Sequence, residues 1–494
     1  MVAEVSPVAF APGFAETHSG VVFFYGDRAY KVKKPVDLGF LDFRTLEARE
    51  AVCRREVELN SRLAPDVYLG VAEVVDPEGE VCEYLVAMRR MPTERRLTNL
   101  IANDVDVGLD IDALAESIAR FHADAEHSPA ADRTADVDAL ATRWASNTAG
   151  MQPFIGRFLD GDDVAAIDAL ATRYLTGRRA LFTRRIEDGR ACDGHGDLQA
   201  DDIFLLDDGP RVLDCLEFDD SLRLDDGLAD AAFLAMDLER LGRADLGERF
   251  LKSYREHSGD SWPASLAHHH IAYRAQVRAK VSAIRADQGV TDSGPKAQAL
   301  LELALRHLET GAVRLIVVGG LPGTGKSTLA AGLGEALGAV VLRSDVIRKE
   351  LAGLETDESA AAGFGEGLYS DEAKDVVYDE MLARAEQALS LGETVVLDAA
   401  WTDGDRRAMY HRVAEDTVSD LVELRCVLPR RVAAERIRER AERATDASDA
   451  DAAIAVAMER FDDPWPTAID IDTLAPAEEV VQRALSALPP GQTT

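Results

Sequence analysis

A glycine-rich segment in the second half of the chain constrains the fold more than any other feature. Residues 320–327 read Gly-Leu-Pro-Gly-Thr-Gly-Lys-Ser. They match the pattern GxxxxGK[ST], whose glycines let backbone N–H groups converge on phosphate oxygens at the start of a helix. An apolar run (315–318) precedes the segment, and a helix-forming run (328–337) follows it. The sequence therefore predicts a phosphate-binding loop between a buried strand and a helix.

The loop and its neighbours have distinct predicted roles. We expect Lys326 to neutralise the β- and γ-phosphates of ATP or GTP, and the Ser327 hydroxyl to bind Mg²⁺. Asp398 follows the apolar run 394–397 and is either a second metal ligand or a strand-end cap. The predicted nucleotide-binding residues of the loop are Gly320, Leu321, Pro322, Gly323, Thr324, Gly325, Lys326, Ser327 and Thr328.

Charged residues elsewhere in this half are candidates for the transfer step. Asp345 follows the strand-like run 340–342, where a carboxylate can accept the proton of a substrate hydroxyl. Arg348 can then hold an anionic group of that substrate, although a capping Asp and a solvated Arg are the alternative. Arg436, Arg440 and Arg443 share one helical face by their spacing. They can close over the phosphates as a lid, or form ion pairs on an exposed helix.

At these residues the segment from about 315 to 475 resembles the small P-loop kinases of the polynucleotide-kinase, gluconate-kinase and zeta-toxin type. The resemblance implies that Asp345 is the catalytic base, that Arg348 grips the substrate, and that the arginine segment is a mobile lid. Strand-like runs alternate with helical ones here, at 314–318, 340–342, 394–397, 421–427 and 468–471. Such alternation predicts a parallel sheet that is covered on both faces.

A second group of candidate residues lies in the N-terminal half. The segment His195-Gly-Asp197-Leu-Gln-Ala-Asp-Asp202 is followed by a strand (203–206), a turn (207–209) and Asp214. Three carboxylates on such a segment can supply one proton acceptor and two Mg²⁺ ligands for transfer of a γ-phosphoryl group. The alternative is a solvated acidic loop in an acidic chain.

This segment resembles the aminoglycoside phosphotransferases and choline kinases, relatives of the protein kinases, at their HxDxxxxN motif. The resemblance implies that Asp197 is the base, that Asp202 is a metal ligand where Asn is usual, and that Asp214 is the other metal ligand. In that family a strand Lys pairs with a Glu on the next helix. Lys31 or Lys33, with Glu56, occupy those places and are expected to contact ATP.

Over nearly its full length the chain resembles bacterial fusions of an aminoglycoside phosphotransferase-like domain with a P-loop, AAA-family ATPase-like domain. The segments 30–35 (Tyr-Lys-Val-Lys-Lys-Pro), 39–43 (Gly-Phe-Leu-Asp-Phe) and 215–218 (Cys-Leu-Glu-Phe) add to this resemblance. We therefore expect a multidomain α/β protein. A bilobal protein-kinase-like (α+β) domain spans 1–310, with an N-lobe to about 95 and a C-lobe from about 96, and a P-loop parallel-sheet α/β domain spans 311–494.

The composition narrows the class of partner. A net charge of −34 disfavours nucleic acid, and no aromatic–basic interleaving indicates a strand-binding groove. The apolar runs are far shorter than the ~20 residues of a membrane span, and the N-terminus lacks the features of a signal peptide. We therefore expect a cytoplasmic protein with no membrane segment. Five separated cysteines predict reduced thiols, and no feature predicts an oligomeric state.

These observations predict an ATP-dependent kinase with two nucleotide sites that phosphorylates a hydroxyl of a small molecule. One alternative is a nucleotide-sensing regulator, in which one domain binds ATP without transfer. The other is phosphorylation of nucleic-acid 5′-hydroxyl ends by the P-loop domain.

Two further features receive structural interpretations. His268, His269 and His270 are expected on an ordinary helix surface, and Arg274 and Arg278 share a helical face, for packing between the domains or for binding an anion.

Overall fold

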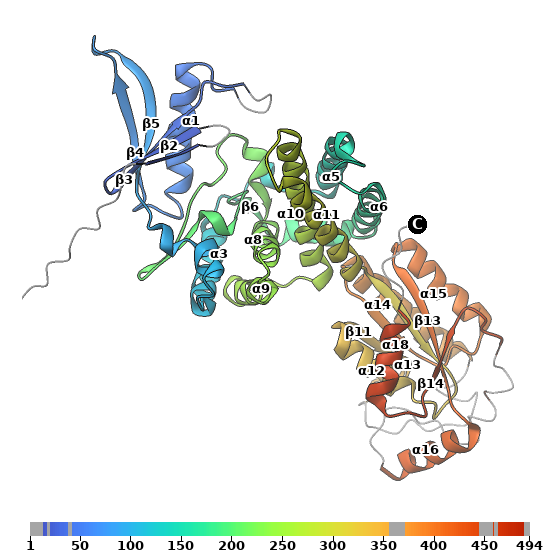
Figure 1. Ribbon diagram of the computed structural model, residues 1–494. Helices are drawn as coiled ribbons and strands as arrows, with labels where there is room; N and C mark the ends of the chain where they lie inside the picture. The colour runs from blue at the N-terminus through green and yellow to red at the C-terminus, as the bar shows by residue number, and fades with distance from the viewer. Residues whose placement is uncertain are drawn as a thin grey trace, which may run out of the picture. The chain divides into compact units, whose positions relative to one another are not determined.

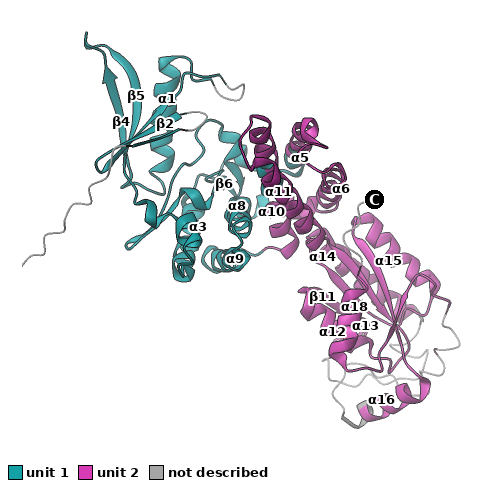
Figure 2. Cartoon of the chain, in the orientation of Figure 1, with its two compact units in different colours: residues 1–140, 185–261, 273–278 teal, residues 141–184, 262–272, 279–494 magenta. Residues whose placement is uncertain are grey.

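The computed structural model of the chain describes residues 13–16, 20–37, 42–354, 371–443, 458 and 463–488. The chain divides into two compact units (Figure 2). Residues 1–140, 185–261 and 273–278 form unit 1, and residues 141–184, 262–272 and 279–494 form unit 2. The boundary expected near residue 310 stays a prediction. Part of the segment 39–43 lies outside the described residues.

Unit 1 begins with an antiparallel sheet of five strands and one helix (Figure 1). The strands are β1 (Gly13–Glu16), β2 (Gly20–Tyr25), β3 (Arg28–Lys33), β4 (Tyr68–Val75) and β5 (Val81–Arg89), in the order β1-β2-β3-β5-β4. The predicted hairpin is the β2–β3 pair, which turns at Gly26 and Asp27. Helix α1 (Leu46–Asn60) starts at Thr45, whose hydroxyl accepts the N–H of Ala48 at 3.2 Å. These elements form the expected N-lobe.

The rest of unit 1 is mainly helical. Its principal helices are α3 (Gly108–Asp124), α8 (Gly227–Arg240) and α9 (Ala244–Ser258), and its short strands are β6 (Ala191–Asp193), β7 (Ile203–Leu206), β8 (Gly209–Val212) and β9 (Leu224–Asp226). The antiparallel pairs β6–β9 and β7–β8 carry the loops that hold the predicted carboxylates. Residues 227–238 of α8 are all buried, so this helix is a central support for those loops. The sheet, the single N-lobe helix and the helical C-lobe make this region protein-kinase-like.

Unit 2 contains a parallel sheet of five strands. They are β10 (Arg314–Gly319), β11 (Val340–Arg343), β12 (Val395–Asp398), β13 (Asp420–Val427) and β14 (Ile469–Asp472), in the order β11-β12-β10-β13-β14. Every pairing is parallel, and all five predicted strands are present. In β10, residues 315–318 are fully buried. Because successive side chains alternate between the faces, both faces of this strand are covered.

Helices surround the sheet of unit 2. Helices α12 (Lys326–Leu337) and α18 (Ala477–Ser486) pack on the face that Ile316 and Val318 line. The other helices that follow strands are α13 (Ser344–Leu351), α14 (Asp371–Ser390), α15 (Gly404–Asp416) and α16 (Arg430–Arg443). This is the predicted P-loop α/β architecture. The unit also includes α6 (Gly161–Gly177) and α11 (Ser293–Thr310) and part of α10 (Ala264–Asp287).

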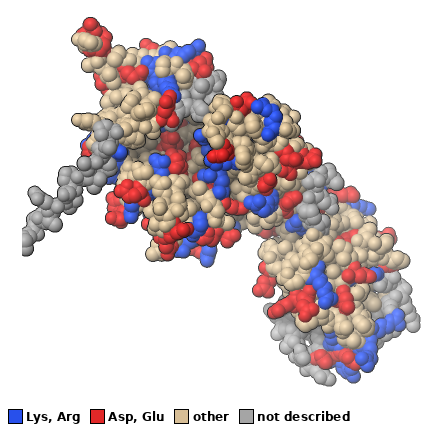
Figure 3. All heavy atoms as spheres, in the orientation of Figure 1, with Lys and Arg blue, Asp and Glu red and all other residues tan. Residues whose placement is uncertain are grey.

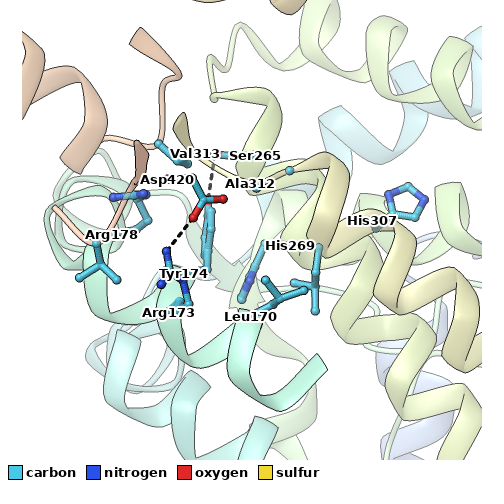
Figure 4. A pocket seen from close by; sticks show the side chains of 13 residues that line it. Leu170, Arg173, Tyr174, Arg178, Ser265, His269, His307, Ala312, Val313 and Asp420 are labelled. Atoms are coloured by element: carbon cyan, nitrogen blue, oxygen red, sulfur yellow. Dashed lines mark hydrogen bonds and ion pairs between the residues drawn. The ribbon is translucent and has the colours of Figure 1, made fainter. Parts of the chain in front are cut away.

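Helix α10 contains the one local expectation that is wrong. The side chains of His269 and His270 are only 1% exposed, so they do not lie on an ordinary helix surface. The His269 ring stacks on Tyr174 at 4.5 Å between centroids and borders a cavity of about 30 Å³ (Figure 4). The Trp144 indole N–H donates to Nε2 of His269 at 3.3 Å. The aromatic rings that cover these two histidines, Tyr174 and Phe182, belong to other segments of the chain, so the spacing within α10 does not reveal the burial.

No helix among the described residues is both long and apolar enough to cross a lipid bilayer.

Candidate active sites

The backbone of residues 319–326 forms an open loop that only glycine permits at two points. Strand β10 ends at Gly319, and α12 begins at Lys326. Gly320 has φ 131° and Gly323 has φ 79°, conformations that other residues rarely adopt. A Cβ atom would lie 2.6 Å from the carbonyl oxygen of Cys426 at Gly320, and 2.6 Å from that of Ala433 at Gly323. The predicted cradle is therefore present, and it presents backbone at a helix start, which fits a phosphate chain.

Three predicted side chains meet at the start of α12. The Lys326 ammonium donates to the carbonyl of Leu321 at 3.1 Å, across the loop. Asp398, at the end of β12 and 4% exposed, accepts a hydrogen bond from Ser327. Burial raises the pKa of Asp398, while Lys326 and Ser327 oppose that rise. A hydroxyl beside a carboxylate is an oxygen pair that Mg²⁺ accepts together with nucleotide phosphates, so these residues fit the metal predicted here.

Asp345 and Arg348 lie together on the first turns of α13, directly after β11. Arg348 Nη1 is 2.5 Å from Asp345 Oδ1, and the Arg348 side chain is nearly buried. Arg343, at the end of β11, places Nε 3.3 Å from Asp398 Oδ2. The two predicted carboxylates are thus each paired with an arginine. Sequence reasoning missed Arg343, although its place at a strand end beside Asp345 was a signal.

The arginine segment is only partly described. Arg436 on α16 donates from Nη2 to the carbonyl of Thr473 at 2.9 Å, and its Nη1 is 3.4 Å from where a Cβ of Gly325 would lie. Thr473 in turn donates its hydroxyl to the carbonyl of Thr324 at 2.6 Å. Arg436 therefore lies next to the loop, and its part in a lid over the phosphates stays a prediction. The side chains of Arg440 and Arg443 lie outside the described residues.

In unit 1 the two candidate lysines and the candidate glutamate form one chain of ion pairs. Lys31 on β3 contacts Asp214 at 2.6 Å and Glu56 on α1 at 2.8 Å. Lys33 contacts the other oxygen of Glu56 at 2.6 Å and Glu217 at 2.5 Å. Burial alone would lower the pKa of Lys31, but Asp214 and Glu56 hold it well above its usual value. Both lysines pair with Glu56, while Lys31 is the one that reaches Asp214.

The three predicted carboxylates of this unit interact with one another electrostatically. Asp214 has φ 63°, a left-handed conformation that is uncommon for Asp and recurs at functional sites. Its neighbour Lys31 lowers its pKa. Burial and then the charges of Asp214 and Asp197 raise the pKa of Asp202 well above its usual value. The carboxylates therefore share one electrostatic environment, as a two-metal transfer site requires.

The described residues contain no gathered group of three or more His, Cys, Asp or Glu side chains that is ready to hold a metal ion. Mg²⁺ commonly takes one or two carboxylates plus substrate phosphates and water. Asp202 and Asp214 supply oxygen atoms of that kind, so they fit a metal that arrives with a nucleotide.

Helix α8 holds the loop that carries Asp197. The buried carboxylate of Asp230 accepts the backbone N–H of His195 at 2.6 Å and of Gly196 at 2.9 Å. Two turns along the helix, Asp237 accepts the N–H of Ala200 at 3.0 Å. Sequence reasoning missed both residues. Two carboxylates seven residues apart within an apolar helix were the available signal, because buried charges need specific partners.

Two arginines of α10 lie near the same loop. Arg274 is buried and donates to the carbonyl of Gly196 at 3.4 Å. Arg278 Nη1 lies 4.0 Å from Asp197 Oδ1. Burial raises the pKa of Asp197, and Arg278 opposes that rise. The shared helical face that the sequence predicts therefore faces the loop that carries Gly196 and Asp197, within unit 1.

Acidic and basic side chains are interspersed over the surface. On the face in Figure 3 the lysines and arginines of the described residues lie among aspartates and glutamates and form no continuous basic stripe. This distribution agrees with the strongly acidic composition.

Comparison with known proteins gives matches for the whole chain and for each half. The family model described as an AAA domain matches residues 315–464. The uncharacterized protein Rv2004c of Mycobacterium tuberculosis (strain H37Rv) is 46% identical over 471 residues, which cover 95% of this chain and 94% of that protein.

Two solved structures illustrate the matches to the separate halves. A GDP complex of aminoglycoside 2'-phosphotransferase-IIIa is 15% identical, covers 61% of this chain and 94% of its own, and has a TM-score of 0.39. The APS kinase CysC of Mycobacterium tuberculosis is 19% identical, covers 35% of this chain and 96% of its own, and has a TM-score of 0.27.

Proposed function

The chain belongs to the same family as the mycobacterial protein Rv2004c, and we propose that it is an ATP-dependent phosphotransferase with one nucleotide site in each unit. The proposal takes ATP, or GTP, as the phosphate donor and a hydroxyl group of a small molecule as the acceptor. We also propose, as the sequence predicts, that the protein is cytoplasmic and does not act on nucleic acid.

The observation that carries the proposal is the loop at residues 320–327. A glycine-rich backbone curls ahead of α12, Lys326 crosses the loop, and Ser327 lies against Asp398. A purely structural turn needs neither a buried carboxylate beside a serine nor two glycines closed in by carbonyl oxygens. Phosphate binding uses all of these features.

The residues of unit 2 divide the work of transfer between them. The backbone N–H groups and Lys326 hold the triphosphate, and Mg²⁺, when bound, neutralises charge on its β- and γ-oxygens. Asp345 accepts the proton of the acceptor hydroxyl, and Arg348, which lies against it, holds an anionic group of the acceptor. Arg436, near Gly325, adds positive charge beside the phosphates.

The residues of unit 1 support an equivalent division. Asp197 accepts the hydroxyl proton, and its raised pKa makes it a better proton acceptor than an exposed Asp. Lys31 exchanges Asp214 for the phosphates of ATP, and Asp202 and Asp214 hold the metal. The backbone of the loop stays fixed because Asp230 holds it from α8.

One observation favours a second function for unit 1, a nucleotide-sensing domain that binds ATP without transferring phosphate. Asp202 stands where Asn is usual in the resembling kinases, and burial, followed by the charges of Asp214 and Asp197, raises its pKa. A protonated carboxyl is a poor Mg²⁺ ligand, and an ionised one adds negative charge beside the base, so either state weakens the case for fast transfer in this half. Under this alternative unit 2 alone is the kinase.

The test is a transfer assay on the full chain with γ-labelled ATP and Mg²⁺. Acceptors are a panel of hydroxyl metabolites, aminoglycosides and an oligonucleotide with a 5′-hydroxyl. Acceptor-dependent label transfer is expected for at least one small molecule, and Lys326→Ala or Asp197→Ala identifies the unit responsible. Arg431→Ala is the matched control, since that side chain is highly exposed on α16. A protein that neither retains ATP at millimolar concentration nor transfers label contradicts the proposal. Label on the oligonucleotide alone replaces the small-molecule acceptor with nucleic acid.

A further inference from the structure

The ion-pair chain in unit 1 has one more lysine and one more glutamate than the proposed chemistry uses. Lys31, Glu56 and Asp214 have assigned roles at the ATP phosphates and the metal. Lys33 and Glu217 have none, yet their contact is 2.5 Å and the Lys33 side chain is fully buried. Burying a lysine and a glutamate is costly unless the pair is well placed. The second pair therefore needs an explanation.

Sequence spacing shows what the second pair ties together. Lys31 and Lys33 are two residues apart on β3 and point to the same side of the strand. Asp214 and Glu217 are three residues apart on the segment that follows β8 (Gly209–Val212). The contacts Lys31–Asp214 and Lys33–Glu217 are thus two parallel cross-links between β3 and that segment, and Glu56 of α1 lies between the lysines.

Under the proposed function, ATP takes Lys31 from the first of these cross-links. Asp214 then loses its contact with Lys31, and among the described residues Lys33 is the lysine that ATP leaves paired with Glu56. Glu56 is fully buried, so without Lys33 it would depend on Lys31 alone for its charge. If the Lys33–Glu217 contact were also lost, neither cross-link to β3 would hold the segment that carries the left-handed Asp214.

We propose that Lys33 and Glu217 are positioning residues, which keep Glu56 charged and hold the 214–217 segment against β3 while Lys31 exchanges Asp214 for ATP. The proposal rests on the proposed function of unit 1 as an ATP site. It assigns a role to Glu217, which neither the catalytic-loop pattern nor the Lys–Glu pair includes. It also separates the two lysines: Lys31 contacts ATP, and Lys33 does not.

The test measures equilibrium binding of ATP in the presence of Mg²⁺ to the full chain carrying Lys326→Ala, so that unit 1 supplies the site. In this background Lys33→Met and Glu217→Gln are each expected to raise the Kd for ATP about tenfold. The double variant Lys33→Leu/Glu217→Leu places an apolar pair in the same volume, which commonly keeps or restores folding. Glu56 keeps only Lys31 as a partner in this variant, so its thermal unfolding midpoint is expected to lie above that of Lys33→Met rather than at the parent value, while its Kd remains raised about tenfold.

A matched control lies on the same helix. Arg49 of α1 pairs with Glu83 of β5 at 2.9 Å, away from the carboxylates of the loop. Glu83→Gln tests the loss of an ion pair that joins α1 to the sheet, and its Kd for ATP is expected to stay within twofold of the parent.

Three outcomes overturn the positioning role. Unchanged ATP affinity in both single variants, or recovery of affinity together with stability in the double leucine variant, would make the pair purely structural. An equal loss in Glu83→Gln would make the effect a general one of α1 docking. Failure of the Lys326→Ala parent itself to bind ATP would remove the ATP site of unit 1 and the positioning role with it. That result can be told apart from the other outcomes, because it is measured in the Lys326→Ala parent before Lys33 or Glu217 is changed.

Discussion

The support that α8 gives to the catalytic loop of unit 1 can be tested at Asp230. Its Oδ2 accepts the N–H of His195 at 2.6 Å and contacts His122 Nε2 at 3.1 Å, and its Oδ1 accepts the N–H of Gly196 at 2.9 Å. All of these groups are buried. In Asp230→Asn the amide oxygen can serve His195 and His122, but the amide NH₂ then faces the Gly196 N–H, so two donors oppose each other.

The expected cost follows from these contacts. An unmade buried hydrogen bond costs about 1–3 kcal/mol, and hydrogen bonds to a charged acceptor lie at the upper end. One lost bond and one weakened bond give about 3 kcal/mol of lost stability. For a unit of this size that lowers the unfolding midpoint by roughly 6–12 °C. Because the loop carries Asp197, the rate of acceptor-dependent transfer by unit 1 should fall at least tenfold.

Calorimetry and hydrogen exchange measure the two effects separately. Calorimetry gives the midpoint of unit 1, and mass spectrometry of the peptide that spans His195 and Gly196 gives the protection of their amides, which should fall in Asp230→Asn. Asp245→Asn is the control, because that carboxylate is exposed and pairs with Arg243 on the surface, where ion pairs contribute about 0–1 kcal/mol. A midpoint within 1 °C of the wild-type value, with amide protection unchanged, would refute the support assigned to Asp230.

Three further changes probe unit 2. Gly323→Ala should abolish ATP binding by this unit, measured by equilibrium dialysis with Lys31→Ala present to remove the ATP contact of unit 1, because the new methyl group meets the Ala433 carbonyl at 2.6 Å. Thr473→Val leaves the Thr324 carbonyl without its 2.6 Å partner and should cost about 1–3 kcal/mol in urea unfolding. Burial holds the pKa of His269 well below its usual value, so the unfolded state binds the extra proton below pH ~6.5. Stability should therefore fall by about 1.4 kcal/mol per pH unit from there to pH 5, and His269→Phe should remove that part of the slope in calorimetry.

The sequence predicted the phosphate loop and its sheet well because those features are local. The pattern at 320–327 fixes a strand, a loop and a helix within about 25 residues, and the alternation of apolar runs fixed all five strands of the parallel sheet. A pairing of Lys31 or Lys33 with Glu56 was also predicted, through a resemblance that places the lysine on a strand and the glutamate on the next helix, and the structure pairs both lysines with Glu56.

The missed residues all act through partners that are distant in the chain. Asp230 binds the loop at His195 from a helix 35 residues later, and Thr473 reaches Thr324 across 149 residues. Glu217 was noted only as part of a motif, since its contact with Lys33 depends on how two segments 184 residues apart are placed. A single sequence has no signal for such contacts beyond a polar residue in an apolar run. That signal was present at Asp230, and it was absent at Thr473.

The charge balance of the two sites differs in a way that bears on how an acidic protein binds an anionic nucleotide. The net charge of −34 acts weakly at long range, because salt screens exposed charges beyond about 8–10 Å. The charges close to each site therefore decide its affinity for the nucleotide. In unit 2 the cations near the loop offset the acids, namely Lys326, Arg343 and Arg348 against Asp345 and Asp398. In unit 1 the cations Lys31, Lys33 and Arg278 face a larger set of carboxylates, namely Glu56, Asp197, Asp202, Asp214 and Glu217. Without added cations this set repels a triphosphate, so ATP binding by unit 1 must draw more on divalent metal than binding by unit 2. The affinity of unit 1 for ATP should accordingly fall more steeply as Mg²⁺ is removed.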